Sequence, residues 1–272
     1  MTVITKITVG KKNKSRYNIF IDQGNGEEYG FSVSEEVLIK LDLKKGKVID
    51  QMDAMEIAYQ EDIQKALTAA LHFLSFRMRS EYEVKAYLQE KDFESHIIKE
   101  VIHKLYQLNY LNDEEFAMAF VSTKINGADK GPIVIAQELK LKGVEESLIQ
   151  KALLQYTDEL QLSHAIKLAS KMASVGKNRS AIEVKRKAEQ TLVRKGYVSF
   201  IIEEALREVD FSQEEEVEWD SLRNHGEKAV RRYSKYEGYE FKQKVKSALY
   251  RKGFPIELIE RYLDEIQQEI GE

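Results

Sequence analysis

The sequence predicts a mostly α-helical protein, with a small β-rich head at the N-terminus followed by four tandem three-helix repeats in an elongated curved array. Two observations carry this prediction. One segment recurs along the chain, and the spacing of apolar residues changes from alternation in residues 1–50 to helical periodicity afterwards. The composition agrees, because only 2 Pro and 14 Gly occur among 272 residues, and both residue types disfavour helix interiors.

The recurring segment begins with a Leu, reaches Lys-Gly, and continues with apolar pairs at helical spacing. Lys195-Gly196 is the clearest example, and a Gly after the last turn is the usual residue where a helix ends with positive φ. Asp92 takes this place in the first copy. Repeats of this period predict stacked helical units that bury their faces on one another. The copies begin at Leu88, Leu139, Leu192 and Leu249.

The Lys before each turn also recurs. A cation in the last turn of a helix complements the helix dipole, and we favour this interpretation over a binding role. The residues concerned are Lys91, Lys142, Lys195 and Lys252.

Residues 1–53 are predicted to form the β-rich head. Strands are expected near 3–9, 17–21 and 29–33, with Gly24-Asn25-Gly26 as a hairpin turn. Ser34 begins a short helix, and Val48-Ile49 pairs back as a last strand. A basic cluster at the first turn is either a solvated loop or a contact for acidic protein or phosphate. It consists of Lys11, Lys12, Lys14 and Arg16.

Capping patterns divide the remaining chain into four three-helix repeats. Ser80 with Glu83 is a capping box, and Ser180 with Glu183 repeats it at the second helix of the third repeat. Pro132 is suited to the first turn of a helix. The predicted repeats cover residues 54–109, 110–157, 158–212 and 213–272.

Catalytic and metal-site patterns are not found in the sequence. The chain has 0 Cys, which excludes disulfides and thiolate chemistry, and its 5 His form no HExxH motif. A phosphate-binding Gly-rich loop and a nucleophile paired with a base are also missing. An apolar signal core or a run of membrane-spanning length is not seen either. We therefore expect a non-enzymatic protein with no cofactor, no metal and no membrane partner.

Positive charge is concentrated in two segments although the net charge is −4. Cations outnumber anions from Lys177 to Lys195 and again from Arg231 to Lys252. In the repeat alignment Lys185 matches Lys242, Lys187 matches Lys244, and Arg194 matches Arg251, and Lys246 lies among them. The second helices of repeats three and four should therefore form basic ridges. Such ridges suit an acidic protein groove or a single-stranded nucleic-acid backbone, unless they are only a solvated surface.

Three segments resemble the RecX family of recombination regulators. They are Arg77-Met78-Arg79-Ser80-Glu81, Tyr110 to Val121, and Lys130-Gly131-Pro132 with the downstream Lys142-Gly143-Val144. The family more often has Arg before the Gly-Pro, so Lys130 departs from its pattern. The resemblance is strongest over residues 60–156 and extends to 157–268 through the repeat.

This resemblance implies a cytoplasmic, monomeric bacterial protein that acts on RecA in DNA recombination, repair and the SOS response. Family members bind RecA and the groove of the RecA–ssDNA filament. They usually inhibit filament growth, ATP hydrolysis, strand exchange and co-protease activity, and some also bind single- or double-stranded DNA. We expect the ridge cations to make the partner contacts, with second-rank contacts from Arg77, Arg79 and Lys130. Two alternatives stay open, a direct DNA-binding helical repeat protein and a helical scaffold for another protein.

Overall fold

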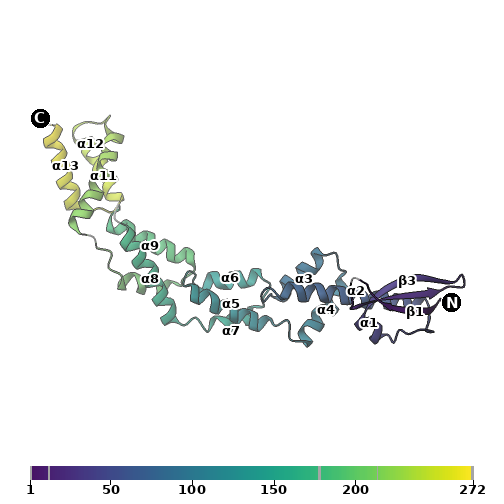
Figure 1. The fold of residues 1–272 in the computed structure, drawn as a ribbon. Coiled ribbons are helices and arrows are strands. Elements are labelled where there is room, and N and C mark those ends of the chain that lie inside the picture. The colour runs from purple at the N-terminus through teal and green to yellow at the C-terminus, as the bar shows by residue number, and fades with distance from the viewer. Residues whose placement is uncertain (1, 12, 177–178, 213, 271–272) are drawn as a thin grey trace. The chain divides into compact units, whose positions relative to one another are not determined.

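The computed structural model describes residues 2–11, 13–176, 179–212 and 214–270, and the chain forms two compact units. One comprises residues 1–117 with 140–148, and the other comprises 118–139 with 149–272. The predicted fold class is confirmed, because a small N-terminal sheet is followed by helices along the rest of the described chain (Figure 1). The curvature of the array and the predicted domain boundaries stay predictions.

The head is a four-stranded antiparallel sheet with one short helix. Its strands are β1 (Thr2–Val9), β2 (Arg16–Asp22), β3 (Glu27–Ser34) and β4 (Val48–Ile49), in the spatial order β3-β2-β1-β4. Helix α1 (Glu35–Lys40) begins at Ser34, whose hydroxyl accepts a hydrogen bond from the Val37 backbone N–H, as its sequence predicts. Alternate strand residues supply the core, which includes Ile4, Ile19 and Val33.

The head packs on α2 (Gln51–Leu74) through an apolar contact and a partly buried ion pair. Ile57 joins the core of the head. One turn further, the Glu61 carboxylate lies 2.6 Å from the Arg16 guanidinium and accepts a hydrogen bond of 2.9 Å from the Ser34 backbone N–H. Arg16, predicted to belong to a basic loop, is thus a structural residue. Of that cluster, Lys11 and Lys14 are exposed, and Lys12 lies outside the described residues.

Helices follow in four sets of three, which we number as repeats. Repeat one contains α2, α3 (Glu81–Glu90) and α4 (Ser95–Gln107), and repeat two contains α5 (Asp113–Gly127), α6 (Pro132–Leu141) and α7 (Glu146–Leu153). Repeat three contains α8 (Asp158–Val175), α9 (Ala181–Lys195) and α10 (Ser199–Glu208), and repeat four contains α11 (Glu215–Tyr233), α12 (Gly238–Arg251) and α13 (Ile256–Ile270).

Repeats one and four each have a continuous apolar core. Leu88 at the end of α3 and Leu249 at the end of α12 are fully or almost fully buried, as expected for the first Leu of the recurring segment. The apolar pairs of the helix that follows complete each core, with Ile97 and Ile98 in α4 and Ile259 in α13.

A repeated contact links the second helices of successive repeats. In repeat one the Ser80 hydroxyl donates to the Lys142 carbonyl at 2.7 Å, and the Glu83 carboxylate pairs with the Lys142 ammonium at 3.0 Å. In repeat three the Ser180 hydroxyl donates to the Lys252 carbonyl at 2.5 Å. The residues that cap one helix therefore also bind the end of a helix in the next repeat.

Repeats two and three are linked in a similar way, but here a backbone N–H takes the place of the Ser hydroxyl. The Gly131 backbone N–H, just before Pro132, donates to the Lys195 carbonyl at 2.7 Å, and the Lys195 ammonium pairs with Asp129. The recurrent Lys thus does more than complement a helix dipole. Lys142, Lys195 and Lys252 each contact an acidic residue of the preceding repeat.

Gly196 shows why the recurring segment needs Gly. It has φ of +84°, and a Cβ added there would lie 2.6 Å from the backbone nitrogen of Val134 in α6. Asp92, in the first repeat, tolerates a φ of +61° where no helix of an earlier repeat exists to approach it. The substitution of Asp for Gly in the first copy therefore has a physical reason.

Candidate partner-binding surface

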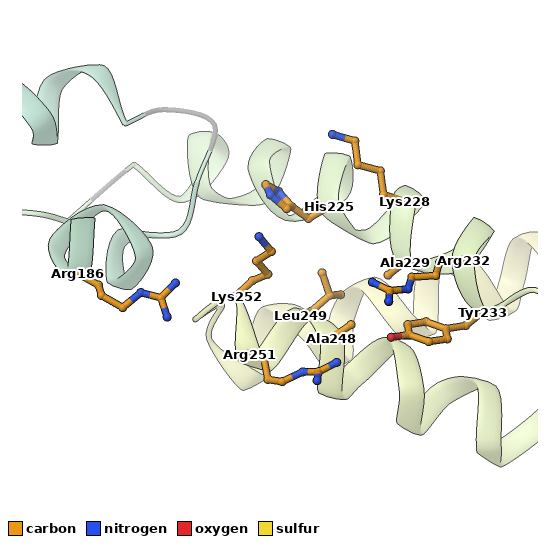
Figure 2. Close-up of a pocket in the computed structure, with 10 residues that line it drawn as sticks. All are labelled: Arg186, His225, Lys228, Ala229, Arg232, Tyr233, Ala248, Leu249, Arg251 and Lys252. Carbon is orange, nitrogen blue, oxygen red and sulfur yellow. The ribbon is translucent and has the colours of Figure 1, made fainter. Parts of the chain in front are cut away.

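A basic pocket lies where repeat three meets repeat four within the second compact unit. Its volume is about 610 Å³, and no carboxylate is among its lining residues in the described chain. Ala229, Ala248 and Leu249 form an apolar floor, and the ring of Tyr233 lies at one side (Figure 2). Its cationic side chains, called the basic pocket residues below, are Arg186, Lys228, Arg232, Arg251 and Lys252, and His225 lies beside them.

Three helices position these cations. Arg186 projects from α9, Lys228 and Arg232 are one turn apart on α11, and Arg251 and Lys252 end α12. Like charges spaced by four residues on a helix repel one another, so the pair on α11 has an unfavourable interaction when the pocket is empty of anions. The pocket is therefore a region of positive potential built on an apolar floor.

Few described contacts neutralise the pocket. Arg251 donates to the Ser247 carbonyl at 3.3 Å, and the Arg232 guanidinium lies 5.6 Å from the Tyr233 ring centre. Lys252 is 3.9 Å from the Glu183 carboxylate. No ion pair is described for the other two cations, on α9 and α11.

His225 belongs to the same pocket. Its Nδ1 lies 2.9 Å from the Ser221 carbonyl, and its ring is 5.6 Å from that of Phe254. These contacts hold the imidazole against the core of repeat four.

The structure separates the predicted ridge residues into two groups. Lys185 and Arg194 on α9 are exposed, Lys242 on α12 is half-buried, and none has an ion pair among the described residues. Together with Arg251 of the pocket, they are available to a partner.

The other ridge cations have acidic partners within the protein. Lys187 pairs with Glu183 at 3.4 Å. Lys244 pairs with Glu240 at 3.5 Å and lies over the ring of Tyr236. Lys246 pairs with Glu260 of α13 at 2.8 Å. Continuous basic ridges are therefore interrupted by acidic side chains, and Lys177 lies outside the described residues.

The second-rank residues are also engaged internally. The Arg77 guanidinium pairs with Glu83 at 2.8 Å, and Lys130 pairs with Glu138. Arg79 stacks on Phe73 at 4.1 Å. Desolvation, followed by the nearby Arg77 charge, lowers the pKa of Arg79 from its usual high value. In this structure these three residues stabilise the ends of helices.

Sequence analysis missed the convergence of the basic pocket residues. Arg186 and Arg232 were counted as charges, but they have no cation at the matching position of the other repeat. Lys228 lies outside both basic segments. The alignment of repeats compares equivalent positions, whereas the pocket joins non-equivalent ones. The signal that could have found it is the i,i+4 pair of cations Lys228 and Arg232 on α11.

A metal centre is not supported. In the described part of the chain, no three His, Cys, Asp or Glu side chains form a group that could hold a metal ion. The ring of His96 in α4 instead stacks on Tyr59 at 5.6 Å. None of the described helices is long and apolar enough to cross a membrane.

Family models match most of the elements described above. The N-terminal domain of regulatory protein RecX matches residues 2–50. The first, second and third three-helix domains of RecX match residues 66–105, 112–153 and 216–263.

Individual proteins agree with these models. A regulatory protein RecX of Halalkalibacterium halodurans is 46% identical over 266 residues, which cover 97% of this chain and 100% of that protein. One of Bacillus velezensis is 44% identical over 266 residues, with 97% and 99% covered. A crystal structure of regulatory protein RecX aligns with a TM-score of 0.69 at 35% identity, over 76% of this chain and 100% of the other. The crystal structure of RecX from Lactobacillus salivarius aligns with a TM-score of 0.54 at 36% identity, over 56% of this chain and 99% of the other. The chain belongs to the RecX family of regulatory proteins.

Proposed function

We propose that this protein regulates RecA by binding RecA and the groove of the RecA–ssDNA filament. Its most direct effect would be inhibition of filament growth, with loss of ATP hydrolysis, strand exchange and co-protease activity. It would act as a non-catalytic monomer in the cytoplasm. Family membership supports the choice of RecA, since the relatives are named regulatory proteins RecX.

The observation that carries the proposal is the concentration of available cations on repeats three and four. Lys185, Arg194 and Lys242 reach solvent without a described acidic partner, and the basic pocket residues belong to the same two repeats. A filament presents acidic protein surface together with nucleic-acid phosphates. Both attract the cations of repeats three and four at distances up to about a Debye length. Binding should therefore weaken as salt rises.

The test is RecA ATP hydrolysis on single-stranded DNA with the protein titrated in at two salt concentrations. Wild-type protein should inhibit at well below one molecule per RecA. The triple variant K185E, R194E and K242E should need about tenfold more protein, because charge reversal in a contact surface slows association and costs more than 1 kcal/mol.

The matched control reverses three exposed cations elsewhere, in K99E, K140E and K167E. None of these has a described ion pair, so the control changes net charge equally and should inhibit as wild type does. If the triple variant and the control lose inhibition equally, only net charge matters, and the cations of repeats three and four are not the contact. Absence of inhibition at any ratio would refute RecA regulation.

Direct DNA binding is the second candidate function, and the basic pocket favours it. Three-helix units with a basic second helix are similar in outline to helix-turn-helix modules. In the same titration, inhibition that begins only when the protein saturates the DNA would support this function instead.

A further inference from the structure

The basic pocket draws its cations from two repeats, and this placement suggests more than a general positive surface. We infer that the basic pocket binds adjacent phosphate groups and that a bound phosphate chain holds repeat four against repeat three. The inference deepens the proposed function, because it assigns a ligand class and a structural consequence to the same surface.

The charge of the pocket points to a polyanion. Five cations and no lining carboxylate meet over an apolar floor, so like charges are gathered there and repel one another. Two or more negative charges would relieve this repulsion. A single carboxylate would leave most of it in place.

The side-chain chemistry points to phosphate. Three of the five cations are Arg, whose planar guanidinium forms paired hydrogen bonds to phosphate oxygens. A volume of about 610 Å³ is in the range of pockets that hold whole small molecules, so it accommodates several linked groups. The shared ligand chemistry is a chain of phosphates, supplied either by a nucleic-acid backbone or by a free oligophosphate.

The positions of the cations explain the structural consequence. Arg186 belongs to α9 of repeat three, whereas the other four belong to α11 and α12 of repeat four (Figure 2). An anion that pairs with Arg186 and Arg251 together therefore bridges the two repeats.

Lys252 connects the pocket to the contact between repeats. Its carbonyl accepts the Ser180 hydroxyl at 2.5 Å, while its ammonium lies 3.9 Å from Glu183 Oε2, which has no described hydrogen bond. Glu183 also has Arg179 at 3.6 Å and Lys187 at 3.4 Å. The Lys252 ammonium can thus turn to a phosphate while Glu183 stays neutralised and the backbone contact persists.

Calorimetric titration of the full chain, without RecA, tests the ligand class. Two probes are used, inorganic tripolyphosphate and an oligothymidylate. The pocket variant R186Q with R251Q should bind both probes at least about tenfold more weakly than wild type, because each substitution removes a charge-assisted hydrogen bond.

The matched control is K167Q with R231Q, which removes one cation from each of the same two repeats outside the pocket lining. It should bind both probes within about twofold of wild type, since screened surface charges contribute little. Equal weakening in both variants, or none in the pocket variant, would overturn the inference. If R186Q with R251Q does not fold, K228Q with R232Q tests the same pocket from α11 alone.

The two phosphate sources are separated by the two probes. Binding of both probes, lost only in the pocket variant, assigns the pocket to phosphate chains in general. Pocket-dependent binding of oligothymidylate alone assigns it to a nucleic-acid backbone.

Amide hydrogen exchange tests the structural consequence. Tripolyphosphate, or oligothymidylate if only that probe binds, should slow exchange at least about threefold over residues 181–184 and 252–254, where the repeats meet, because local opening becomes less frequent. Unchanged protection with the ligand bound would overturn the bridging role.

Failure of this inference differs from failure of the proposed function. A protein that inhibits RecA but binds neither probe through the pocket retains the function and loses the inference. If the protein binds phosphate through the pocket but leaves RecA unaffected, the inference is retained and the proposed function is lost.

Discussion

Glu83 has two structural tasks at once. It closes the capping box of α3 with Ser80, and it pairs with Arg77 at 2.8 Å and Lys142 of the next repeat at 3.0 Å. Burial alone would raise its pKa, but hydrogen bonds from Arg77, Lys142 and the Ser80 backbone outweigh burial and lower the pKa to about 2. Glu83, which the sequence predicts as part of a helix cap, is thus also a contact between repeats.

This pKa makes a prediction about acid stability. A carboxylate whose pKa is lower in the folded than in the unfolded state contributes stability above its unfolded pKa and loses it as pH falls towards 2. Wild type should therefore lose about 2 kcal/mol more stability than E83Q between pH 5 and pH 2.5. Urea unfolding at a series of pH values measures the difference.

Gln retains an acceptor for the capping box, so E83Q isolates the charge. E90Q, which removes an exposed carboxylate from the same helix, is the control and should follow wild type. Parallel pH curves for wild type and E83Q would contradict the assigned role of Glu83.

Single residues also show the limit of sequence reasoning. Lys187 and Lys244 occupy matching positions, and the charge pattern predicts that both contact a partner. Each instead has a carboxylate one turn earlier on its own helix, Glu183 and Glu240. The i,i+4 spacing was present in the sequence, but the burial of Glu183, which makes that pair structural, depends on tertiary packing.

At the scale of elements, the helices were predictable because local signals agree. Capping residues, Lys-Gly ends and apolar periodicity all indicate the same boundaries, and α3 and α9 begin directly after the predicted Ser80 and Ser180. The contacts between second helices were not predictable. They join residues distant in sequence, such as Gly131 and Lys195, through backbone groups that every residue possesses.

The approach of α6 to the end of α9 makes a stability prediction. G196A combines a φ of +84° with a new Cβ 2.6 Å from the Val134 backbone nitrogen. G238A, in the same compact unit, has a φ of +53° with nothing within 4 Å of its Cβ. Both variants incur a backbone cost of about 1–2 kcal/mol.

G196A should incur a further 1–3 kcal/mol, about the usual cost of overpacking. Thermal unfolding of the two variants beside wild type measures this gap. If G196A and G238A are equally stable, the close approach between the repeats does not constrain the Gly.

At the scale of the whole molecule, the described surface is distinguished by where its positive charge lies. Lys185 and Arg251, which have no described ion pair, lie on repeats three and four, whereas Arg77 of repeat one is paired with Glu83. The basic ridges predicted from the sequence lie on the same two repeats as the pocket, but Arg251 is the one pocket residue among the predicted partner contacts. The pocket depends on how α9, α11 and α12 meet, which repeat periodicity does not specify.

We propose that the partner of this protein is the RecA filament and not bare DNA. Fluorescence anisotropy of a chain labelled at an introduced cysteine tests it directly. The natural sequence has 0 Cys, and Asn25 lies at an exposed turn of the head, so N25C gives a single label.

The labelled protein is titrated with RecA–ssDNA filament and with the same DNA alone, at physiological salt. We expect at least about tenfold tighter binding to the filament than to the DNA alone, a difference of about 1.4 kcal/mol. Equal or tighter binding to bare DNA, or no binding to the filament, would contradict it.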